Sequence, residues 1–414
     1  RMRGRTGIAG VVVALGLTLA IVTRAAATTA TISPAGNLLL DGAPFFPIGI
    51  YHVSWIGDRQ GGEAIPDLVR AADAGFNLFH PSVDGRDSMG DLFDVAAARG
   101  VYVIGEIPWP ANGPDFFVNA WKAKPALIAW NVADDFNAPF VGPTYNHPPS
   151  QVAARRDVIR ALAPEHLAYA SGGSYPGYRI AEFARTMDVM GFQSYPIGAE
   201  NHPDDYALQE NAESFMWVRD QLAGTGQLFV ANPQAYRWAG PHRYPTPHEA
   251  RNMLYAPLVY GAKGIVWYTM WEGNGTLLPS VVPGLWDALA RLNDETASLV
   301  PFLLHGARTE LPTGHVRVHA ASWERDGQVL VVALSTERTV SHAVSLDLPA
   351  AAPGPAYALF PTRGEHGMTV VDGMLTGTVG PEEVHVYVLD LPVAGDASPT
   401  AAFTVAPPMP AFGE

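Results

Sequence analysis

Two adjacent acidic side chains, Asp134 and Asp135, end a short apolar run in the segment ALIAWNVADDFNAP. An apolar run that ends in charge is typical of a parallel barrel strand whose carboxyl end faces a pocket. Carboxylates in such a place can donate and accept protons in catalysis. Asp and Asn are also common in turns and helix caps, so the segment by itself leaves a solvated turn as the alternative.

Two further acids, Glu106 and Glu272, also follow apolar runs. Paired carboxylates across a pocket are what glycosidic cleavage requires, because one protonates the leaving oxygen while the other attacks the anomeric carbon or activates water. The Gly-Asn-Gly that follows Glu272 favours a pocket position for this residue. For Glu106, a structural ion pair is an equally good interpretation.

A serine hydrolase is the rival interpretation, but no G-x-S-x-G elbow follows a predicted strand. The SGGS segment at Ser171–Ser174 is interpreted as a turn-like loop. The chain contains no cysteine, which excludes thiolate metal sites, catalytic thiols and disulfides. No two histidines have the spacing of metal ligands on a helix, so we predict neither a metal nor a cofactor.

The composition indicates a globular protein with a neutral ligand. The 414 residues are 48% hydrophobic and 16% charged, which is enough apolar material for a large core. A formal net charge of −14, with no basic run beyond the first five residues, would repel a polyphosphate backbone, so nucleic acid is not an expected partner. The ten Trp, 15 Tyr and 17 Phe suit a sugar, although most aromatic residues fill cores.

The first 30 residues have the layout of a secretory signal peptide. Arg1, Arg3 and Arg5 precede an apolar stretch from Ile8 to Val22, and small residues follow it. That stretch is about 15 residues long, shorter than the roughly 20 of a spanning helix, so we favour export over the alternative of a membrane anchor. We expect a secreted, extracellular or periplasmic protein with no stable membrane insertion after signal cleavage.

The elements that would position the acids form eight β-α units. Strand-like apolar runs alternate with segments of helical period, several of which end at a glycine that would cap a helix. Eight such units close a (β/α)8 barrel; an open doubly wound sheet is the alternative, but no glycine-rich phosphate loop follows an early strand. The predicted strands are Phe45–Val53, Asn77–Val83, Val101–Ile107, Leu127–Ala133, Leu167–Ala170, Val189–Tyr195, Leu228–Pro233 and Gly264–Met270. The predicted helices are Ile65–Ala74, Met89–Arg99, Phe116–Lys122, Gln151–Leu162, Tyr178–Arg185, Ala207–Leu222 and Pro247–Tyr260.

A smaller domain follows the barrel. The segment Gly284–Leu304 is interpreted as a closing helix, and the short alternating strands after it, separated by Gly, Pro and Asp turns, predict an antiparallel β-sandwich. We therefore expect a signal peptide over residues 1–30, a catalytic barrel over 31–305, a C-terminal β-sandwich over 306–392, and a Pro- and Ala-rich linker or disordered tail over 393–414.

In barrels of this kind the active site lies at the carboxyl ends of the strands. The predicted ends carry many polar and aromatic side chains. Histidines there are more often structural than catalytic, and the aromatic rings could pack in the core or serve as platforms for sugar rings. The set comprises Tyr51, His52, His80, Glu106, Trp109, Asp134, Asp135, Gln193, Tyr195, Asn232, Gln234, Tyr236, Trp271 and Glu272.

Three segments resemble barrel glycoside hydrolases of the beta-galactosidase and cellulase superfamily. NLLLDGAPFFPIGIYH is similar to the phrase that leads into their first barrel strand, and EARNMLYAPLVYGAKGIVWYTMWEG is similar to their last helix and strand. ALIAWNVADDF resembles their fourth strand, where Trp precedes an Asn-Glu or Asp-Glu pair. The similarity spans roughly Asn37 to Leu304, and a trailing β-domain is also usual in that superfamily.

The resemblance implies that Asp135 is the general acid/base and Asp134 its polar partner. The family's nucleophile, a Glu that ends the seventh strand, is replaced here by Gln234. An amide cannot act as a carboxylate nucleophile, which argues against the usual retaining mechanism. The nearest replacement is Glu272 on the eighth strand, opposite the fourth, and a wider separation of the two acids would suit an inverting mechanism.

We therefore expect a secreted glycoside hydrolase that acts on a poly- or oligosaccharide. Asp135 is the expected acid and Glu272 the base or nucleophile, with Glu106 and Asp134 as alternatives. The main alternative function is a barrel that has lost catalysis and only binds carbohydrate, and a hydrolase of non-sugar polymers is a weaker third; the sugar, the linkage and the oligomeric state stay open. The residues expected to bind sugar are His80, Trp109, Gln193, Tyr195, Gln234, Tyr236 and Trp271.

Overall fold

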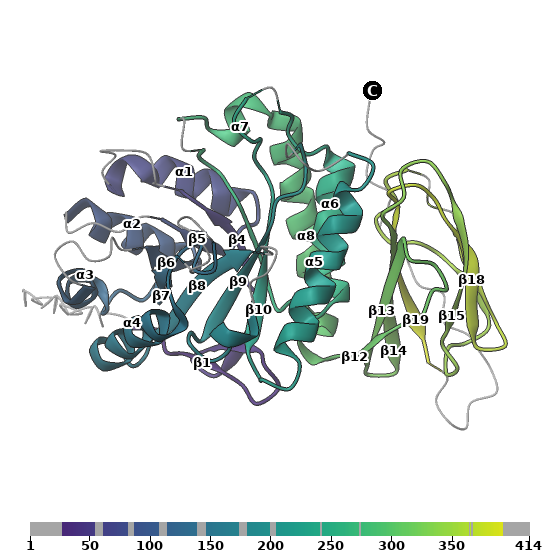
Figure 1. The fold of residues 1–414 in the computed structure, drawn as a ribbon, viewed down its shortest axis with the longest axis horizontal. Helices are drawn as coiled ribbons and strands as arrows, with labels where there is room; N and C mark the ends of the chain where they lie inside the picture. Colours follow the sequence, from purple (N-terminus) through teal and green to yellow (C-terminus); the bar gives the residue numbers. More distant parts are fainter. Residues whose placement is uncertain are drawn as a thin grey trace, which may run out of the picture.

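The computed structural model describes residues 27–53, 61–81, 87–106, 114–138, 146–173, 180–198, 204–240, 242–272, 275–363, 365 and 367–391. They form two units that lie side by side, a barrel surrounded by helices and a smaller β-sandwich (Figure 1). The first 26 residues of the predicted signal peptide, Trp109 and the predicted tail lie outside the described residues.

A closed barrel of eight parallel strands forms the larger unit, in the order β10-β11-β4-β5-β6-β7-β8-β9. The predicted (β/α)8 class is therefore confirmed. The strands are β4 (Ile48–Tyr51), β5 (Leu78–His80), β6 (Tyr102–Glu106), β7 (Leu127–Ala133), β8 (Leu167–Gly173), β9 (Val189–Ser194), β10 (Leu228–Pro233) and β11 (Ile265–Trp267). The helices are α1 (Gly61–Asp73), α2 (Asp87–Ala98), α3 (Pro114–Trp121), α4 (Pro149–Leu162), α5 (Ala207–Leu222), α6 (Pro247–Val259), α7 (Leu278–Val281) and α8 (Pro283–His305).

The barrel strands are apolar along their whole length because both of their faces are buried. On β7, every residue is buried. Ile128 joins the apolar cluster of the barrel interior, together with Leu78 and Val230. Trp130 instead belongs to the larger cluster around the barrel, and its Nε1 donates a hydrogen bond to His166 Nδ1 at 3.0 Å. The continuous apolar run of β7 therefore supplies side chains both to the barrel interior and to the layer between the barrel and its helices.

A three-stranded antiparallel sheet of β1 (Ala30–Ile32), β2 (Leu38–Leu40) and β3 (Ala43–Phe45) precedes the barrel. Leu38 and Leu40 of this sheet pack into the interior cluster of the barrel. Because Ala30 N donates to Glu165 O, just before β8 begins, the sheet lies at the amino-terminal end of the strands. The carboxyl ends, where the predicted acids lie, are at the other end.

The structure corrects three predicted elements. The strand predicted over Phe45–Val53 is divided between β3, which ends at Phe45, and β4, which begins at Ile48. The helix predicted over Tyr178–Arg185 is only a short 3-10 turn, Ile180–Phe183, in the described residues, and Arg185 leaves it with φ 65°, outside helical geometry. The predicted SGGS turn is wrong as well, because β8 continues through Ser171 to Gly173.

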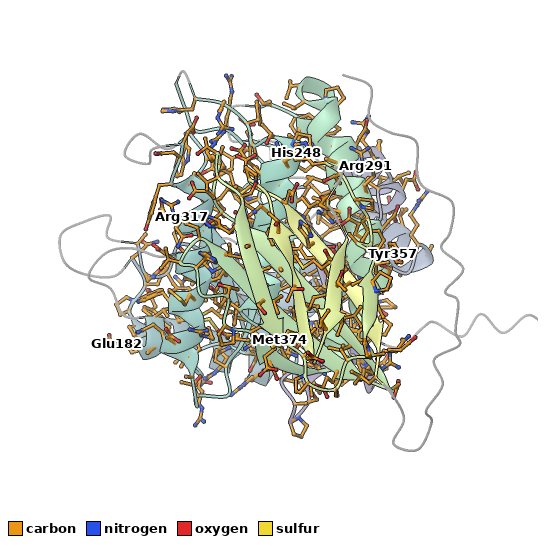
Figure 2. The ribbon with its side chains drawn as sticks, turned by 90° about the vertical axis from the view of Figure 1, so that its right-hand side faces the viewer. Glu182, His248, Arg291, Arg317, Tyr357 and Met374 are labelled. Carbon is orange, nitrogen blue, oxygen red and sulfur yellow. The ribbon has the colours of Figure 1, made fainter. Side chains whose placement is uncertain are left out.

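The smaller unit is a sandwich of two four-stranded antiparallel sheets, which confirms the predicted second fold. One sheet has the order β12-β13-β14-β19 and the other β15-β18-β17-β16. Figure 2 looks onto this sandwich, with Tyr357 and Met374 on the near unit. The strands are β12 (Ala307–Glu310), β13 (Val318–Arg325), β14 (Gln328–Ser335), β15 (His342–Asp347), β16 (Gly354–Ala356), β17 (Met368–Val371), β18 (Met374–Val379) and β19 (Val384–Asp390).

The sandwich packs on the barrel through α6 and α8, which lie between the two units in Figure 1. Arg251 of α6 is the centre of a buried polar contact there. Its Nε lies 3.1 Å from Glu295 Oε2 of α8, and its Nη1 donates to Val384 O of β19 at 2.6 Å. These two contacts join α6 both to α8 and to the sandwich. Within the described ranges, no helix combines the length and apolarity needed to span a membrane.

Candidate active site

The strands that carry the predicted acids stand on opposite sides of the barrel. Three strands separate β7, which precedes Asp134 and Asp135, from β11, which precedes Glu272, in either direction around the ring. Tyr268, directly after β11, lies in the electric field of both groups. Burial raises the pKa of Tyr268, and the charges of Asp134, Asp135, Glu106 and Glu272 raise it further. All four predicted acids therefore lie close enough to Tyr268 to influence its ionisation electrostatically.

Asp134 is held by uncharged donors that belong to barrel strands. Ser171 Oγ of β8 donates a hydrogen bond to Asp134 Oδ1. Gln193 Nε2 of β9 donates to Ser171 Oγ at 2.9 Å and lies 3.5 Å from Asp134 Oδ1. Burial, followed by the charge of Asp135, raises the pKa of Asp134 to about 7, although the bond from Ser171 lowers it. Asp134 therefore titrates near neutral pH.

Asp135 leaves the strand with φ 46°, a left-handed conformation that Asp tolerates better than most residues. Burial raises the pKa of Asp135, and the Gln193 amide and His147 offset part of that rise. A carboxyl group that keeps its proton to higher pH is suited to act as a general acid.

The loop that carries the two acids is attached to the end of β8. Asn137 Nδ2 donates to Gly173 O at 2.6 Å, and Gly173 N donates to Asn137 Oδ1 at 3.0 Å. Gly172 allows this approach, because a Cβ at that position would lie 2.5 Å from Asn137 Oδ1. The reciprocal bonds therefore limit how far Asp135 can move relative to β8.

Glu272 is 6% exposed and lies in a turn after β11. Its backbone N donates to Thr276 O at 2.9 Å, and its Oε1 accepts a hydrogen bond of 2.6 Å from Tyr244 OH. Its neighbour Trp271 is half-buried against the core, and the indole Nε1 donates to Asp67 Oδ2 of α1 at 2.9 Å. Trp271 was predicted to bind sugar; in the structure its one polar donor serves to attach the turn to α1.

Glu106 and His80 form a second polar contact in the barrel mouth. His80 Nδ1 lies 3.8 Å from Glu106 Oε2, and the His80 ring stacks on Tyr51 with centroids 4.0 Å apart. Burial lowers the pKa of His80 well below its usual value, so the ring is neutral at physiological pH. Burial likewise lowers the pKa of His52 to about 3. Neither histidine is charged when a substrate would bind.

A chain of buried hydrogen bonds forms the floor beneath these groups. Tyr51 OH and Tyr169 OH are 2.6 Å apart, and Tyr169 OH donates to Asn232 Oδ1 at 3.0 Å. Asn232 Nδ2 donates to Val266 O at 3.1 Å. Gly191 makes room for this chain, because a Cβ there would lie 2.0 Å from Tyr169 OH. The predicted ring residue Asn232 therefore connects strands of the floor.

Four aromatic side chains extend from the buried centre to the surface on the β9–β11 side. Tyr195 and Tyr236 each have a ring centroid 5.3 Å from that of Tyr268, and Tyr236 is also 5.3 Å from Trp238. Trp238 is 37% exposed, and its Nε1 donates to Tyr195 O at 3.1 Å. Tyr195 OH is buried in the field of Asp134 and Asp135 and has no hydrogen-bond partner among the described residues.

Gln234 does not present its amide to the barrel mouth. Its Nε2 donates to Ile197 O at 2.8 Å and to Tyr236 O at 3.0 Å, and its Oε1 accepts from Ile197 N at 2.8 Å. The side chain is fully buried. A residue whose donors and acceptor are all bonded to backbone would have to give up those bonds to bind sugar. Gln234 therefore holds the ends of β9 and β10 together.

The structure thus brings most of the predicted residues together and adds others that the sequence analysis did not identify. Asp134, Asp135, Glu106 and Glu272 share the field around Tyr268, while Trp109 lies outside the described residues. The SGGS motif was a usable signal for Ser171, because it directly follows an apolar run. Tyr244, by contrast, is 28 residues before Glu272 and shows no sequence sign of contacting it. The residues added are Ser171, Tyr244, Tyr268 and Trp238.

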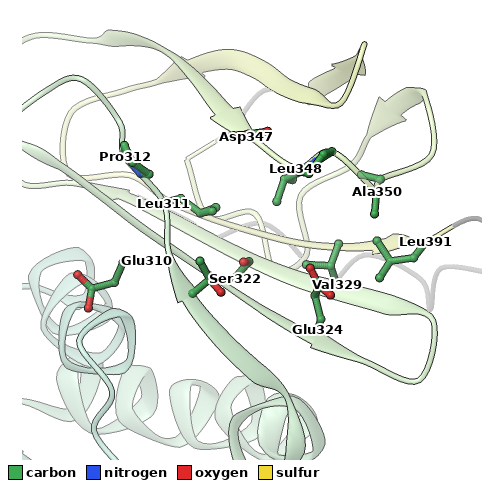
Figure 3. A pocket seen from close by; sticks show the side chains of 13 residues that line it. Glu310, Leu311, Pro312, Ser322, Glu324, Val329, Asp347, Leu348, Ala350 and Leu391 are labelled. Carbon is green, nitrogen blue, oxygen red and sulfur yellow. The ribbon is translucent and has the colours of Figure 1, made fainter. Parts of the chain in front are cut away.

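A cavity of about 310 Å³ lies in the sandwich, and none of the residues that line it belongs to a barrel strand (Figure 3). Glu310 at its edge turns toward α5, where it pairs with Arg219. No aromatic ring lines the cavity, so it lacks a stacking surface for sugar. Its lining is Thr309, Glu310, Leu311, Pro312, Ser322, Glu324, Val329, Asp347, Leu348, Pro349, Ala350, Ala351 and Leu391.

Comparison with known proteins finds similarity in fold. No protein-family model and no curated protein sequence matches the chain. A solved structure described as a glycoside hydrolase is similar with a TM-score of 0.64 and 15% sequence identity, over 89% of this chain and 98% of its own. A glycoside hydrolase family 5 structure from Bacteroides vulgatus ATCC 8482 has a TM-score of 0.62 at 16% identity, over 92% and 96%.

A third similar structure, AmyP in complex with maltose, has a TM-score of 0.54 at 12% identity, over 81% of this chain and 91% of its own. At these identities the likeness establishes the fold. The resemblance to barrel glycoside hydrolases that the sequence predicted is confirmed at that level.

Proposed function

We propose that this chain is a glycoside hydrolase that cleaves a poly- or oligosaccharide, with Asp135 as the general acid and Glu272 as its partner. One observation carries the proposal: Asp134 and Asp135 follow β7 and Glu272 follows β11, so carboxylates from opposite strands lie at the carboxyl end of the barrel, where their charges raise the pKa of Tyr268. Paired carboxylates in such a mouth are the recurring arrangement for glycosidic cleavage. The fold of the similar structures supports the same reaction class.

The surroundings of the acids suit a ligand rich in hydroxyl groups. Tyr195 OH and both ring nitrogens of His80 are buried without hydrogen-bond partners among the described residues. Leaving buried polar atoms unbonded is costly, so such groups often await a ligand or water. A sugar hydroxyl can both donate to and accept from these atoms. We assign substrate binding to His80, Gln193, Tyr195, Tyr236 and Trp238.

In the proposed reaction, Asp135 transfers its proton to the glycosidic oxygen as the bond to the anomeric carbon breaks. A water molecule, deprotonated by Glu272, attacks that carbon from the opposite side. Placement on opposite strands supports this inverting course, because about 6.5–9.5 Å between carboxyl groups leaves room for the water. The proton lost by water ends on Glu272, and exchange with solvent restores both acids. Asp134 is the neighbour of this acid, and the charge of Asp135 contributes to the raised pKa of Asp134.

The chain is also proposed to be secreted, on the strength of its basic and apolar first 30 residues. An exported hydrolase would meet polymeric substrates outside the cell. The exposed Trp238, at the outer end of the aromatic series, supports a substrate longer than one sugar unit.

A barrel that binds carbohydrate without cleaving it is the second candidate. The observation that favours it is Gln234, which stands where the superfamily has its nucleophile and is committed to backbone hydrogen bonds. In that case Asp135→Asn would bind sugar as well as the wild-type protein does, and neither protein would cleave it. The catalytic candidate is preferred because Glu272 supplies a carboxylate on the opposite side.

The test is a hydrolysis screen of the purified protein on a panel of poly- and oligosaccharides, maltooligosaccharides included because similar structures carry maltose and maltotriose. Asp135→Asn and Glu272→Gln are assayed alongside, with Glu324→Gln, an exposed sandwich residue, as the matched control. We expect turnover on at least one substrate, with a bell-shaped pH dependence, and near-complete loss in the first two variants only. Sugar binding without turnover, or full activity in Asp135→Asn, would reject the proposal.

A further inference from the structure

A chain of contacts connects Glu272 to the C-terminal sandwich, and it begins at Tyr244. Tyr244 OH lies 2.6 Å from Glu272 Oε1. Burial raises the pKa of Tyr244, and the hydrogen bond to Glu272 raises it further, so the phenol keeps its proton and is the donor. Arg237 lies over the Tyr244 ring, 5.7 Å from its centroid. The carboxylate of Glu272 thus has a donor that belongs to a different loop.

The segment that carries Tyr244, residues 242–246, is anchored by its neighbour Arg243. Arg243 Nη1 and Nη2 each donate to an oxygen of Glu249 at 2.7 Å, and Nη2 also donates to Asp204 Oδ1 at 3.1 Å. Glu249 is 1% exposed and stands in the first turn of α6, where it also accepts from Thr246 N at 2.8 Å. A bidentate pair with a buried carboxylate fixes orientation as well as position.

The same buried carboxylate is reached from the sandwich. Arg338, between β14 and β15, has Nη1 3.5 Å from Glu249 Oε1 and donates from Nη1 to Asp204 O at 2.9 Å. Its Nε lies 3.2 Å from Glu382 Oε1, within the sandwich. Arg243 and Arg338 therefore hold Glu249 and Asp204 from two sides, one from the barrel loop and one from the sandwich.

We propose that Tyr244 is a positioning residue for Glu272, and that the sandwich stabilises the Tyr244 loop through Arg338. The inference rests on the proposed function, in which Glu272 is the partner of Asp135. A donor on Oε1 restricts the rotation of the Glu272 carboxyl group. A partner acid that must deprotonate water needs this fixed orientation. The sandwich is then part of the catalytic apparatus, because Arg338 stabilises the loop that positions Glu272.

The first test removes only the hydroxyl group. In Tyr244→Phe we expect kcat to fall about tenfold, the loss of one hydrogen bond to a charged group, with KM changed less than twofold. Tyr357→Phe, at a tyrosine that is 73% exposed in the sandwich, is the matched control. An unchanged kcat in Tyr244→Phe, or a KM that changes as much as kcat, would overturn the positioning role.

The second test asks whether the sandwich acts through Tyr244. We expect Arg338→Ala to lower kcat roughly threefold in the wild-type background and to have almost no effect in Tyr244→Phe, because coupled residues are not additive. Arg325→Ala, at a sandwich arginine that pairs with its neighbour Asp326, is the control. Full additivity of Arg338→Ala and Tyr244→Phe would show that the sandwich does not act through this loop.

A third measurement does not depend on activity and separates the inference from the proposed function. The absorbance titration of tyrosinate, taken as the difference between wild type and Tyr244→Phe, isolates Tyr244. The same difference is then taken between Glu272→Gln and the double variant Glu272→Gln/Tyr244→Phe. Tyr244 should ionise at lower pH there, since the charge of Glu272 raises the pKa of Tyr244 in the wild type. No change there would overturn the contact itself. Full activity of Glu272→Gln would instead reject the proposed function and, with it, the positioning role.

Discussion

The acids on the two sides of the barrel are held by different kinds of contact. Asp134 and Asp135 are surrounded by uncharged donors, Ser171 and Gln193, that belong to barrel strands. Glu272 is bonded to Tyr244, whose loop is anchored by ion pairs that involve α6 and the sandwich. The first group is thus fixed by the barrel alone, whereas the second depends on contacts between the two units.

This difference corresponds to the two proposed roles. An acid must keep its proton, and burial raises the pKa of Asp135 because its charged form is poorly solvated. A partner that takes a proton from water must hold its carboxyl group in one orientation, and the hydrogen bond from the Tyr244 phenol restricts the rotation of Glu272. Opposite strands of one barrel thus place one acid among uncharged donors of the barrel itself and the other against a loop that the second unit helps to anchor.

The largest expected effect is the loss of kcat/KM in Asp135→Asn and Glu272→Gln, and its dependence on the leaving group of the substrate distinguishes the two acids. Asp135→Asn should lower kcat/KM about a thousandfold on a natural glycoside but much less on a dinitrophenyl glycoside of the same sugar, whose leaving group needs no proton. Glu272→Gln should be equally impaired on both. Parallel kinetics on the two substrates check this. If kcat/KM of the two variants depended equally on the leaving group, Asp135 could not be distinguished from Glu272 as the proton donor.

A second prediction tests whether the barrel floor supports the Asp134 side. Gly191→Ala should lower the free energy of unfolding by about 2–4 kcal/mol, because the added methyl group would lie 2.0 Å from Tyr169 OH and 2.4 Å from Asn232 Oδ1. Gly284→Ala is the matched control, since nothing lies within 4 Å of its added Cβ. Urea unfolding of both variants provides the measurement. Equal free energies of unfolding for Gly191→Ala and Gly284→Ala would show that the residues around Gly191 move aside without loss of stability.

A third prediction concerns the pH dependence of stability. The pKa of Asp134 in the folded chain, about 7, lies above its unfolded value, so the protonated form favours folding. This contribution is fully present below about pH 4 and is lost as pH rises through about 7. Asp134→Asn should therefore gain stability relative to wild type, on the order of 1–3 kcal/mol, between pH 4 and pH 8.

Urea unfolding at the two pH values checks the sign. Asp372→Asn, in an exposed sandwich turn, serves as the control and should show the same difference from wild type at both. The free energy of unfolding of Asp134→Asn should exceed that of wild type by more at pH 8 than at pH 4. A difference that is constant or smaller at pH 8 would show that the folded chain does not disfavour the charged form of Asp134.

The smallest expected effect is at Trp238. Trp238→Ala should raise KM up to about tenfold for the longest oligosaccharide that is cleaved and leave the shortest unaffected, because a stacked sugar ring contributes on the order of 1 kcal/mol. Tyr357→Ala is the control for loss of an exposed ring. A loss independent of chain length would mean that Trp238 supports Tyr195 and does not bind sugar.

Much of the fold could be predicted because its signals are local. The strands Leu127–Ala133 and Leu228–Pro233 and the helix Ala207–Leu222 agree with their predicted bounds, since each is a single apolar or periodic run. The sheet β1–β3 was missed because its strands are three residues long. Ser171 was placed in a turn because glycines follow it, yet Gly172 serves the close approach of Asn137 and Gly173 ends β8.

The site was less accessible to sequence reasoning because its contacts join distant segments. Strand order placed the acids of the fourth and eighth strands opposite each other, and the topology agrees. Tyr244 and Arg338, however, meet their partners only through the packing of a loop and the sandwich on α6. Gln234 was expected at the sugar because it ends a strand, but side-chain direction, which sequence does not reveal, turns it to the backbone.

Asp135 and Glu272 are proposed to act as a pair across a water molecule, from opposite strands. Proton NMR can identify the sugar anomer released in the first minutes of hydrolysis, before the anomers equilibrate. The product should first appear with the anomeric configuration inverted relative to the substrate. Initial release of the retained anomer would contradict it, because retention requires a nucleophile close to the acid and not a base on the far side of the barrel.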